Sequence, residues 1–188
     1  FVFAVLAQFL YVGAQVGSWS YMILYVQAYA GLGERNAGYL LTLALAAFTV
    51  GRFVSTALLR HVHASRLLAL YGIINTVLCG LAAMQPGWTG VVCLIANSFF
   101  MSMMYPTIFA LGVKGLGART KTGSSFIVMS IVGGAVLTLV MGRLADVAGV
   151  AISYVVPAAC FAVIALYALF ASEPDPEELA AEPGLAEG

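Results

Sequence analysis

Six stretches of apolar residues, each long enough to cross a lipid bilayer, follow one another along this chain of 188 residues. A membrane-spanning helix needs about 20 apolar residues to cross the hydrocarbon core. The stretches are 2–29, 37–59, 67–85, 88–112, 124–145 and 150–171. Short segments containing glycine, proline or charged residues separate them, as helix ends require. The sequence therefore predicts an all-α integral membrane protein with six transmembrane helices.

The composition excludes a water-soluble domain. Hydrophobic residues make up 62% of the chain and charged residues 9%, whereas soluble domains carry about 25% charged residues. The charges are also segregated, because all eight Lys and Arg residues but only two acids, Glu34 and Asp146, precede residue 172. We expect 1–171 to form one transmembrane unit and the Pro- and Glu-rich segment 172–188 to be a disordered acidic tail.

The basic residues predict which ends of the helices face the cytoplasm, because cytoplasmic breaks carry an excess of Lys and Arg. Two breaks, the second and the fourth, hold five of them: Arg60, Arg66, Lys114, Arg119 and Lys121. The other three breaks contain or adjoin only Arg35 and Arg143. Both ends of the chain are therefore expected on the cytoplasmic side of a plasma (inner) membrane, as six spans require.

The first stretch carries polar side chains on one face. Gln8 and Gln15 are seven residues apart, which on a helix is about 20° short of two full turns. Trp19 falls on the same stripe, and Tyr11 and Ser18 flank it. An amide without a partner in hydrocarbon costs several kcal/mol, so this stripe is expected to face another helix or a polar cavity.

The fourth stretch has a similar face. Ser98, Ser102 and Tyr105 lie within about 60° of one another around a helix, and Asn97 lies off their stripe. Pro106 removes a backbone donor from this helix, which is common where a helix lines a site. Isolated groups of this kind often only join helices, at about 0.6 kcal/mol each. Large amides beside an indole suit sugar recognition, but spacing alone predicts only a polar cavity.

Other features have two interpretations each. Gly13 and Gly17 form a GxxxG pattern, and it and the glycine pair 133–134 indicate either close helix packing or a flexible point for gating. Arg52 lies well inside the second stretch. Its side chain either reaches the nearby cytoplasmic surface or forms an ion pair that holds a cytoplasmic gate.

The sequence does not predict catalysis. The segment "TGSSF" is not a GxSxG motif, and both histidines lie in the loop segment "HVH", which indicates a solvated basic loop more than a metal site. We therefore expect no catalytic residues, metal, cofactor or nucleic-acid partner. No Asp or Glu is placed to carry a proton across the membrane midplane.

Four strings of residues resemble the carboxy-terminal half of the L-fucose:proton symporter family, which lies in the major facilitator superfamily and includes glucose/galactose transporters. The strings are "AQFLYVGAQVGSWSYMILY", "YPTIFALGVKGLG", "TGSSFIVMSIVGGAVLTLVMG" and "PAACFAVIALYALF". The resemblance runs through all six stretches in order. It implies a twelve-helix transporter with the sugar bound between two six-helix halves, of which this chain supplies helices seven to twelve.

In such transporters the seventh and tenth helices line the cavity, so the resemblance implies that the polar stripes face a sugar pathway for fucose, galactose or glucose. The substrate-binding residues so implied are Gln8, Tyr11, Gln15, Trp19, Asn97, Ser102 and Tyr105. The membrane carboxylates that the family uses for proton coupling lie in the amino-terminal half. We therefore expect that half to be the partner of this chain.

Two alternatives remain open at this stage. The chain could be a complete six-helix protein that dimerises into a carrier or pore, and parallel assembly of similar halves has precedent. A membrane enzyme or scaffold would need a catalytic constellation that the sequence does not contain. The chain begins inside an apolar run and without Met, so we expect it to be the back part of a longer protein.

Overall fold

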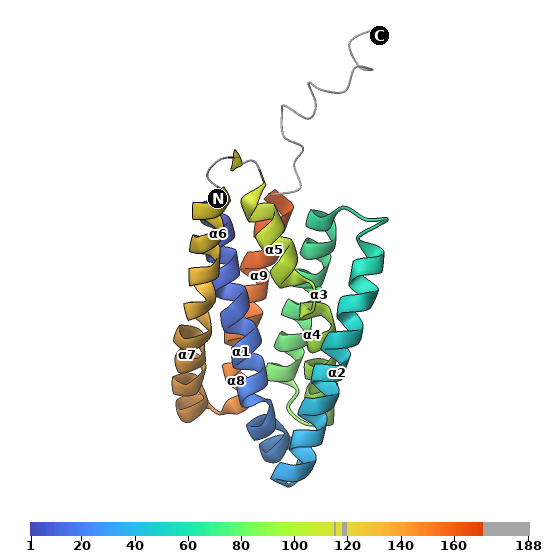
Figure 1. Ribbon diagram of the computed structural model, residues 1–188. Helices are drawn as coiled ribbons and strands as arrows, with labels where there is room; N and C mark the ends of the chain where they lie inside the picture. The colour runs from blue at the N-terminus through green and yellow to red at the C-terminus, as the bar shows by residue number, and fades with distance from the viewer. Residues whose placement is uncertain (115, 118–119, 171–188) are drawn as a thin grey trace.

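The computed structural model describes residues 1–114, 116–117 and 120–170, and this part of the chain is an array of helices (Figure 1). Three spans are single helices: α1 (Val2–Ala30), α2 (Glu34–Leu58) and α3 (Ala64–Met84). The other three are divided: α4 (Trp88–Met101) and α5 (Met104–Val113), then α6 (Thr120–Met129), η2 (Ser130–Val132) and α7 (Gly133–Ala148), then α8 (Val150–Ser153) and α9 (Val155–Phe170). Together they make six spans that are long and apolar enough to cross a membrane.

The six predicted stretches are confirmed, since each coincides with a span whose ends differ from the prediction by at most four residues. The divisions within the last three spans were not predicted as helix ends. Two of them precede a proline, Pro106 in α5 and Pro157 in α9. A proline has no N–H to donate to the carbonyl four residues earlier, so the helix is interrupted there. The predicted tail, 172–188, lies outside the described residues.

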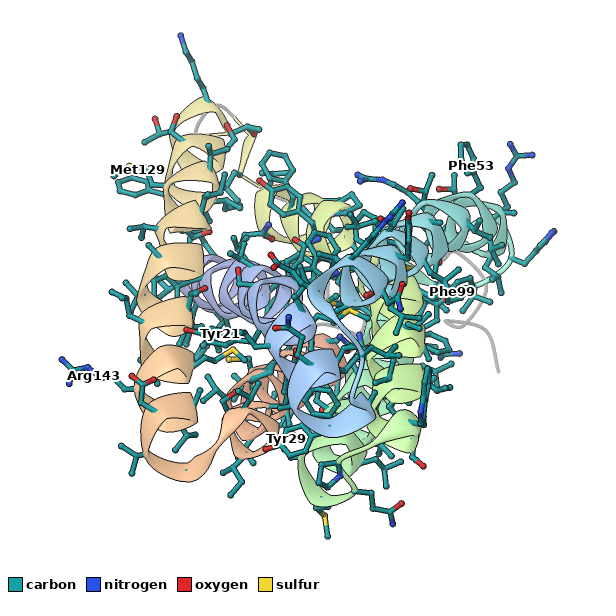
Figure 2. All side chains as sticks on the ribbon, turned by 90° about the horizontal axis from the view of Figure 1, so that it is seen from below. Tyr21, Tyr29, Phe53, Phe99, Met129 and Arg143 are labelled. Carbon is teal, nitrogen blue, oxygen red and sulfur yellow. The ribbon has the colours of Figure 1, made fainter. Side chains whose placement is uncertain are left out.

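Helix α1 lies in the middle of the bundle and packs against α7, α9, α5, η2, α2 and α4. The most exposed spans are those of α2 and of α6 with α7, which form the right and left edges of the view in Figure 1. From below, Phe53 of α2 and Met129 of α6 point outward at two separate corners of the molecule (Figure 2). These apolar outer surfaces suit lipid or further transmembrane helices.

The ends of the spans separate onto two sides of the bundle. The start of α1, the end of α9, the α2–α3 connection and the ends of α5 and α6 that adjoin each other all lie at the top of Figure 1. The two breaks rich in basic residues therefore lie on the same side as both ends of the helical bundle. This is the alternation expected of a chain with six spans, and the assignment of that side to the cytoplasm remains a prediction.

Candidate functional site

Helix α1 attaches to α7 through glycine. A Cβ atom added to Gly13 would overlap the side chain of Leu137, and one added to Gly17 would overlap Met141. Tyr21, one turn further along α1, extends between α1 and α7 and donates a hydrogen bond of 3.4 Å to the carbonyl of Thr138 (Figure 2). Of the two interpretations of the GxxxG pattern, the structure supports close packing.

The glycine pair 133–134 makes a similar contact with α1, from Phe9 to Val16. A Cβ atom on Gly133 would overlap the backbone carbonyl of Phe9, and one on Gly134 would press on Val16. The pair directly follows the 3-10 turn η2, so the α6–η2–α7 span changes its helical form where it meets α1. Glycine allows this approach because it has no side chain to separate the two backbones.

The opposite contact of α1 is formed with the interruption between α4 and α5. The hydroxyl of Tyr11 donates a hydrogen bond of 2.8 Å to the carbonyl of Met101, the last residue of α4. Met101 and Ser102 are buried, and Pro106 has no N–H for the Ser102 carbonyl. Helix α2 also approaches closely here, because a Cβ atom on Gly51 would lie 2.8 Å from Ser102 Oγ.

Three of the seven predicted substrate-binding residues are partly exposed: Gln15, Trp19 and Tyr105. The Trp19 indole N–H donates a hydrogen bond of 3.1 Å to Ser98 Oγ. The Tyr105 ring packs at an angle against Tyr11, with 6.2 Å between the ring centroids. These contacts place partly exposed polar and aromatic groups of α1 and α5 around the interruption, within the membrane-spanning part of the bundle.

The other four predicted residues are buried: Gln8, Tyr11, Asn97 and Ser102. Tyr11 uses its hydroxyl within the protein, as described above. Asn97 lies away from Trp19 and Tyr105, in the contact between α4 and α3. Its amide oxygen lies 3.5 Å from the Cys79 sulfur and its amide nitrogen 3.6 Å from the Met101 sulfur. The structure therefore does not bring Asn97 to the face that carries Gln15 and Trp19.

Several buried polar atoms of α1, α3 and the interruption have no hydrogen-bond partner among the described residues. They include both amide atoms of Gln8, the hydroxyl of Ser102 and the amide oxygen of Asn75. The Asn75 nitrogen lies 3.4 Å from the sulfur of Met104, the first residue of α5. Buried polar groups are normally paired, so these atoms are available to a ligand or to buried water.

Arg52 is exposed on α2, one turn from Phe48, and lines a groove along that helix with Thr49, Phe53 and Thr56. It makes no ion pair with a carboxylate in the part of the chain that the structure describes. A gating ion pair would therefore need an acid from elsewhere, and this role remains a prediction.

Phe48 was missed at the sequence level, because an apolar ring in an apolar helix carries no sign of whether it faces lipid or another side chain.

The described residues contain no group of three or more His, Cys, Asp or Glu side chains that could hold a metal ion. The three cysteines are buried and unpaired with one another. Gln15, Trp19 and Tyr105 therefore offer hydrogen bonds and aromatic surfaces rather than a nucleophile or a metal. Amides can exchange hydrogen bonds with hydroxyl groups, and aromatic rings can pack on apolar faces of a ligand.

No protein-family model matches this chain. It is 46% identical over 172 residues to the L-fucose-proton symporter of Escherichia coli (strain K12), covering 90% of this chain and 39% of that protein. It is 34% identical over 167 residues to the glucose/galactose transporter of Brucella abortus biovar 1 (strain 9-941), covering 88% of this chain and 40% of that protein.

A solved structure also shows similarity to a sugar transporter of this kind. The chain matches the crystal structure of FucP, a major facilitator superfamily transporter in the outward conformation, with a TM-score of 0.89 and 45% identity. The match covers 92% of this chain and 42% of that one. The chain thus spans about two fifths of the length of the relatives that it matches.

Proposed function

Because this chain is homologous to L-fucose-proton symporters and glucose/galactose transporters and has the fold of one half of a major facilitator superfamily transporter, we propose that it forms the carboxy-terminal half of a proton-coupled sugar transporter. The proposed substrate is L-fucose or a related hexose, galactose or glucose. Helices α1 and α4–α5 supply one wall of the sugar cavity.

The observation that carries this proposal is the partly exposed group of Gln15, Trp19 and Tyr105 in the membrane-spanning part of two helices. An amide that faced only lipid would lack hydrogen-bond partners. A sugar would satisfy it, because an amide can both donate to and accept from hydroxyl groups. The aromatic rings would stack on the apolar faces of the sugar ring. Gln8 and Ser102 are buried, and in the proposal they become accessible when the helices rearrange.

The opposite wall and the proton-linked groups belong, in this proposal, to a second six-helix half. The relatives are more than twice as long as the matched segment, which supports such a half. The exposed apolar surfaces of α2, α6 and α7 would contact it or the lipid. The only acids before residue 172 are Glu34 and Asp146. Both lie near helix ends, so we assign proton coupling to carboxylates of the other half.

The proposal also includes an orientation. We propose that the start of α1 and the end of α9 lie on the cytoplasmic side of the inner membrane, and the excess of Lys and Arg in the second and fourth breaks supports this orientation. Arg52 then lies in the cytoplasmic half of α2, where an acid of the second half could pair with it and close the cavity on that side. A second copy of this chain is the alternative occupant of that position.

Uptake by the full-length protein in proteoliposomes tests the proposal. Labelled L-fucose, D-galactose and D-glucose are supplied separately, with and without an inward proton gradient. We expect one of them to accumulate only when the gradient is present. Equal uptake without the gradient would contradict proton coupling, and absence of uptake of all three would contradict the sugar assignment. Uptake by vesicles that contain only residues 1–188 would instead support the dimer of identical chains.

A further inference from the structure

The indole of Trp19 is held by contacts from two other helices. Its N–H donates to Ser98 Oγ on α4 over 3.1 Å. Its ring packs edge to face with Phe48 of α2, with 5.1 Å between ring centroids and an interplanar angle of 82°. A hydrogen bond at the nitrogen and a ring contact from another helix together restrict both rotation and tilt of the indole.

The hydrogen bond has only one possible direction. An indole nitrogen can donate but cannot accept, whereas a hydroxyl has one proton and two lone pairs. The Ser98 hydroxyl donates its proton to the Leu94 carbonyl over 3.1 Å. Its oxygen is thereby left to accept from Trp19. Ser98 is also 1% exposed, so its hydroxyl has little access to water.

Trp19 itself remains partly exposed while Ser98 is buried. Trp19 therefore combines a hydrogen bond to a buried serine with a side chain that keeps some exposed surface. A ring that is already oriented binds with a smaller loss of side-chain entropy than one that must be ordered during binding. The partners of Trp19 thus affect how well it can receive a sugar, although neither needs to contact the sugar.

We infer that Ser98 and Phe48 are positioning residues that orient the Trp19 indole for sugar stacking, with Ser98 setting its rotation and Phe48 its tilt. This inference rests on the proposed function. It adds two residues that affect sugar affinity only by orienting Trp19. Ser98 faces Trp19 rather than the sugar, and its hydroxyl is already shared between Trp19 and the backbone.

The test uses the full-length protein labelled with ¹⁵N-tryptophan, in which the Trp19 indole signal is identified by its loss in Trp19→Phe. Trp88, at the exposed start of α4, provides an internal reference. In Ser98→Ala the Trp19 indole N–H should exchange with solvent about tenfold faster, and L-fucose and D-galactose binding should weaken about three- to tenfold for whichever sugar binds. Ser98→Thr keeps the hydroxyl and should restore both values.

Phe48→Leu should weaken sugar binding about threefold while the slow exchange of the Trp19 indole is kept. Phe53→Leu, on the outward face of the same helix, is the matched control and should change neither value.

Unchanged indole exchange in Ser98→Ala overturns the inference, as does weaker binding that Ser98→Thr fails to restore. If Trp19→Ala weakens binding but Ser98→Ala does not, the positioning role alone is wrong. If Trp19→Ala has no effect on binding, the proposed sugar site fails and this inference fails with it.

Discussion

Helix α1 makes two principal contacts on different sides, and they are built from different chemistry. Toward α7, Gly13 and Gly17 bring two helices together through apolar side chains. Toward α4 and α5, Tyr11 and Trp19 use a hydroxyl and an indole to reach a backbone carbonyl and a serine. On the α7 side an added Cβ atom at Gly13 or Gly17 would overlap a side chain, whereas the α4–α5 side contains partly exposed residues and unpaired buried polar atoms.

The difference separates stability from function within one helix. Close glycine contacts with α7 gain dispersion energy from apolar side chains such as Leu137. The α4–α5 side retains polar groups that would be costly in a purely structural contact. Substitutions on the two sides should therefore fail in different ways.

The largest effect on folding is expected for Gly13→Ala. Its new methyl group would overlap Leu137, and overpacking of this kind costs about 1–3 kcal/mol of folding free energy. Gly80→Ala in α3 is the matched control, because a Cβ atom there meets no atom within 4 Å. It should be neutral or stabilising, by up to about 1 kcal/mol. Thermal unfolding in detergent measures both, and equal midpoints for the two variants would contradict the packing role of the α7 side.

The largest effect on binding without loss of folding is expected for Gln15→Ala. Loss of an amide that bonds sugar hydroxyls should reduce affinity about two- to tenfold, because a hydrogen bond contributes about 0.5–1.5 kcal/mol. Gln27→Ala, near the other end of α1, should leave affinity unchanged. Sugar binding by calorimetry, together with expression and the unfolding midpoint, distinguishes the two. Unaltered binding in Gln15→Ala would return Gln15 to a packing role.

Tyr11→Phe should loosen the interruption between α4 and α5 while keeping the ring in place. The variant loses the hydrogen bond to Met101, worth about 1 kcal/mol. A loss of about 1 kcal/mol should make backbone hydrogen exchange in the segment 99–108 about fivefold faster. Tyr25→Phe, which loses a hydrogen bond of 2.7 Å to Ala82, should affect only the end of α3. The same exchange pattern in both variants would show that Tyr11 has no specific role at the interruption.

Gln8→Met should lower transport without lowering the stability of the fold. Gln8 is buried and its amide has no partner in the described part of the chain. Methionine fills a similar volume without polar atoms, so unfolding should be unchanged or shifted upward by about 1 kcal/mol. Transport should fall if the amide serves the sugar pathway. A variant that is less stable would show that the amide is paired in the folded protein.

The smallest effect is expected from removing the acidic segment 172–188. A solvated tail contributes little to helix packing, so uptake should stay within about twofold of the intact protein. Proteoliposome uptake, normalised to the amount of reconstituted protein, measures this. A large loss would mean that the segment contacts the transmembrane unit.

The sequence by itself determined the six spans and their alternation across the membrane. Length and apolarity decide whether a segment can cross hydrocarbon, and neither depends on the neighbouring helices. It also determined that Gln15 and Trp19 share a face, because the helical period sets their angle around α1. The resemblance of its strings to a transporter family likewise needed no coordinates.

Only the tertiary structure decided what covers each face. The helical period places Tyr11 near Gln15, yet the Tyr11 hydroxyl is already bonded to the Met101 carbonyl. It places Asn97 off the stripe that carries Ser98, but it does not say that Asn97 faces α3 or that Ser98 faces Trp19. A residue's angle around its own helix does not specify which helix lies opposite. Burial and pairing are properties of two elements at once, so they follow from the packing of the bundle.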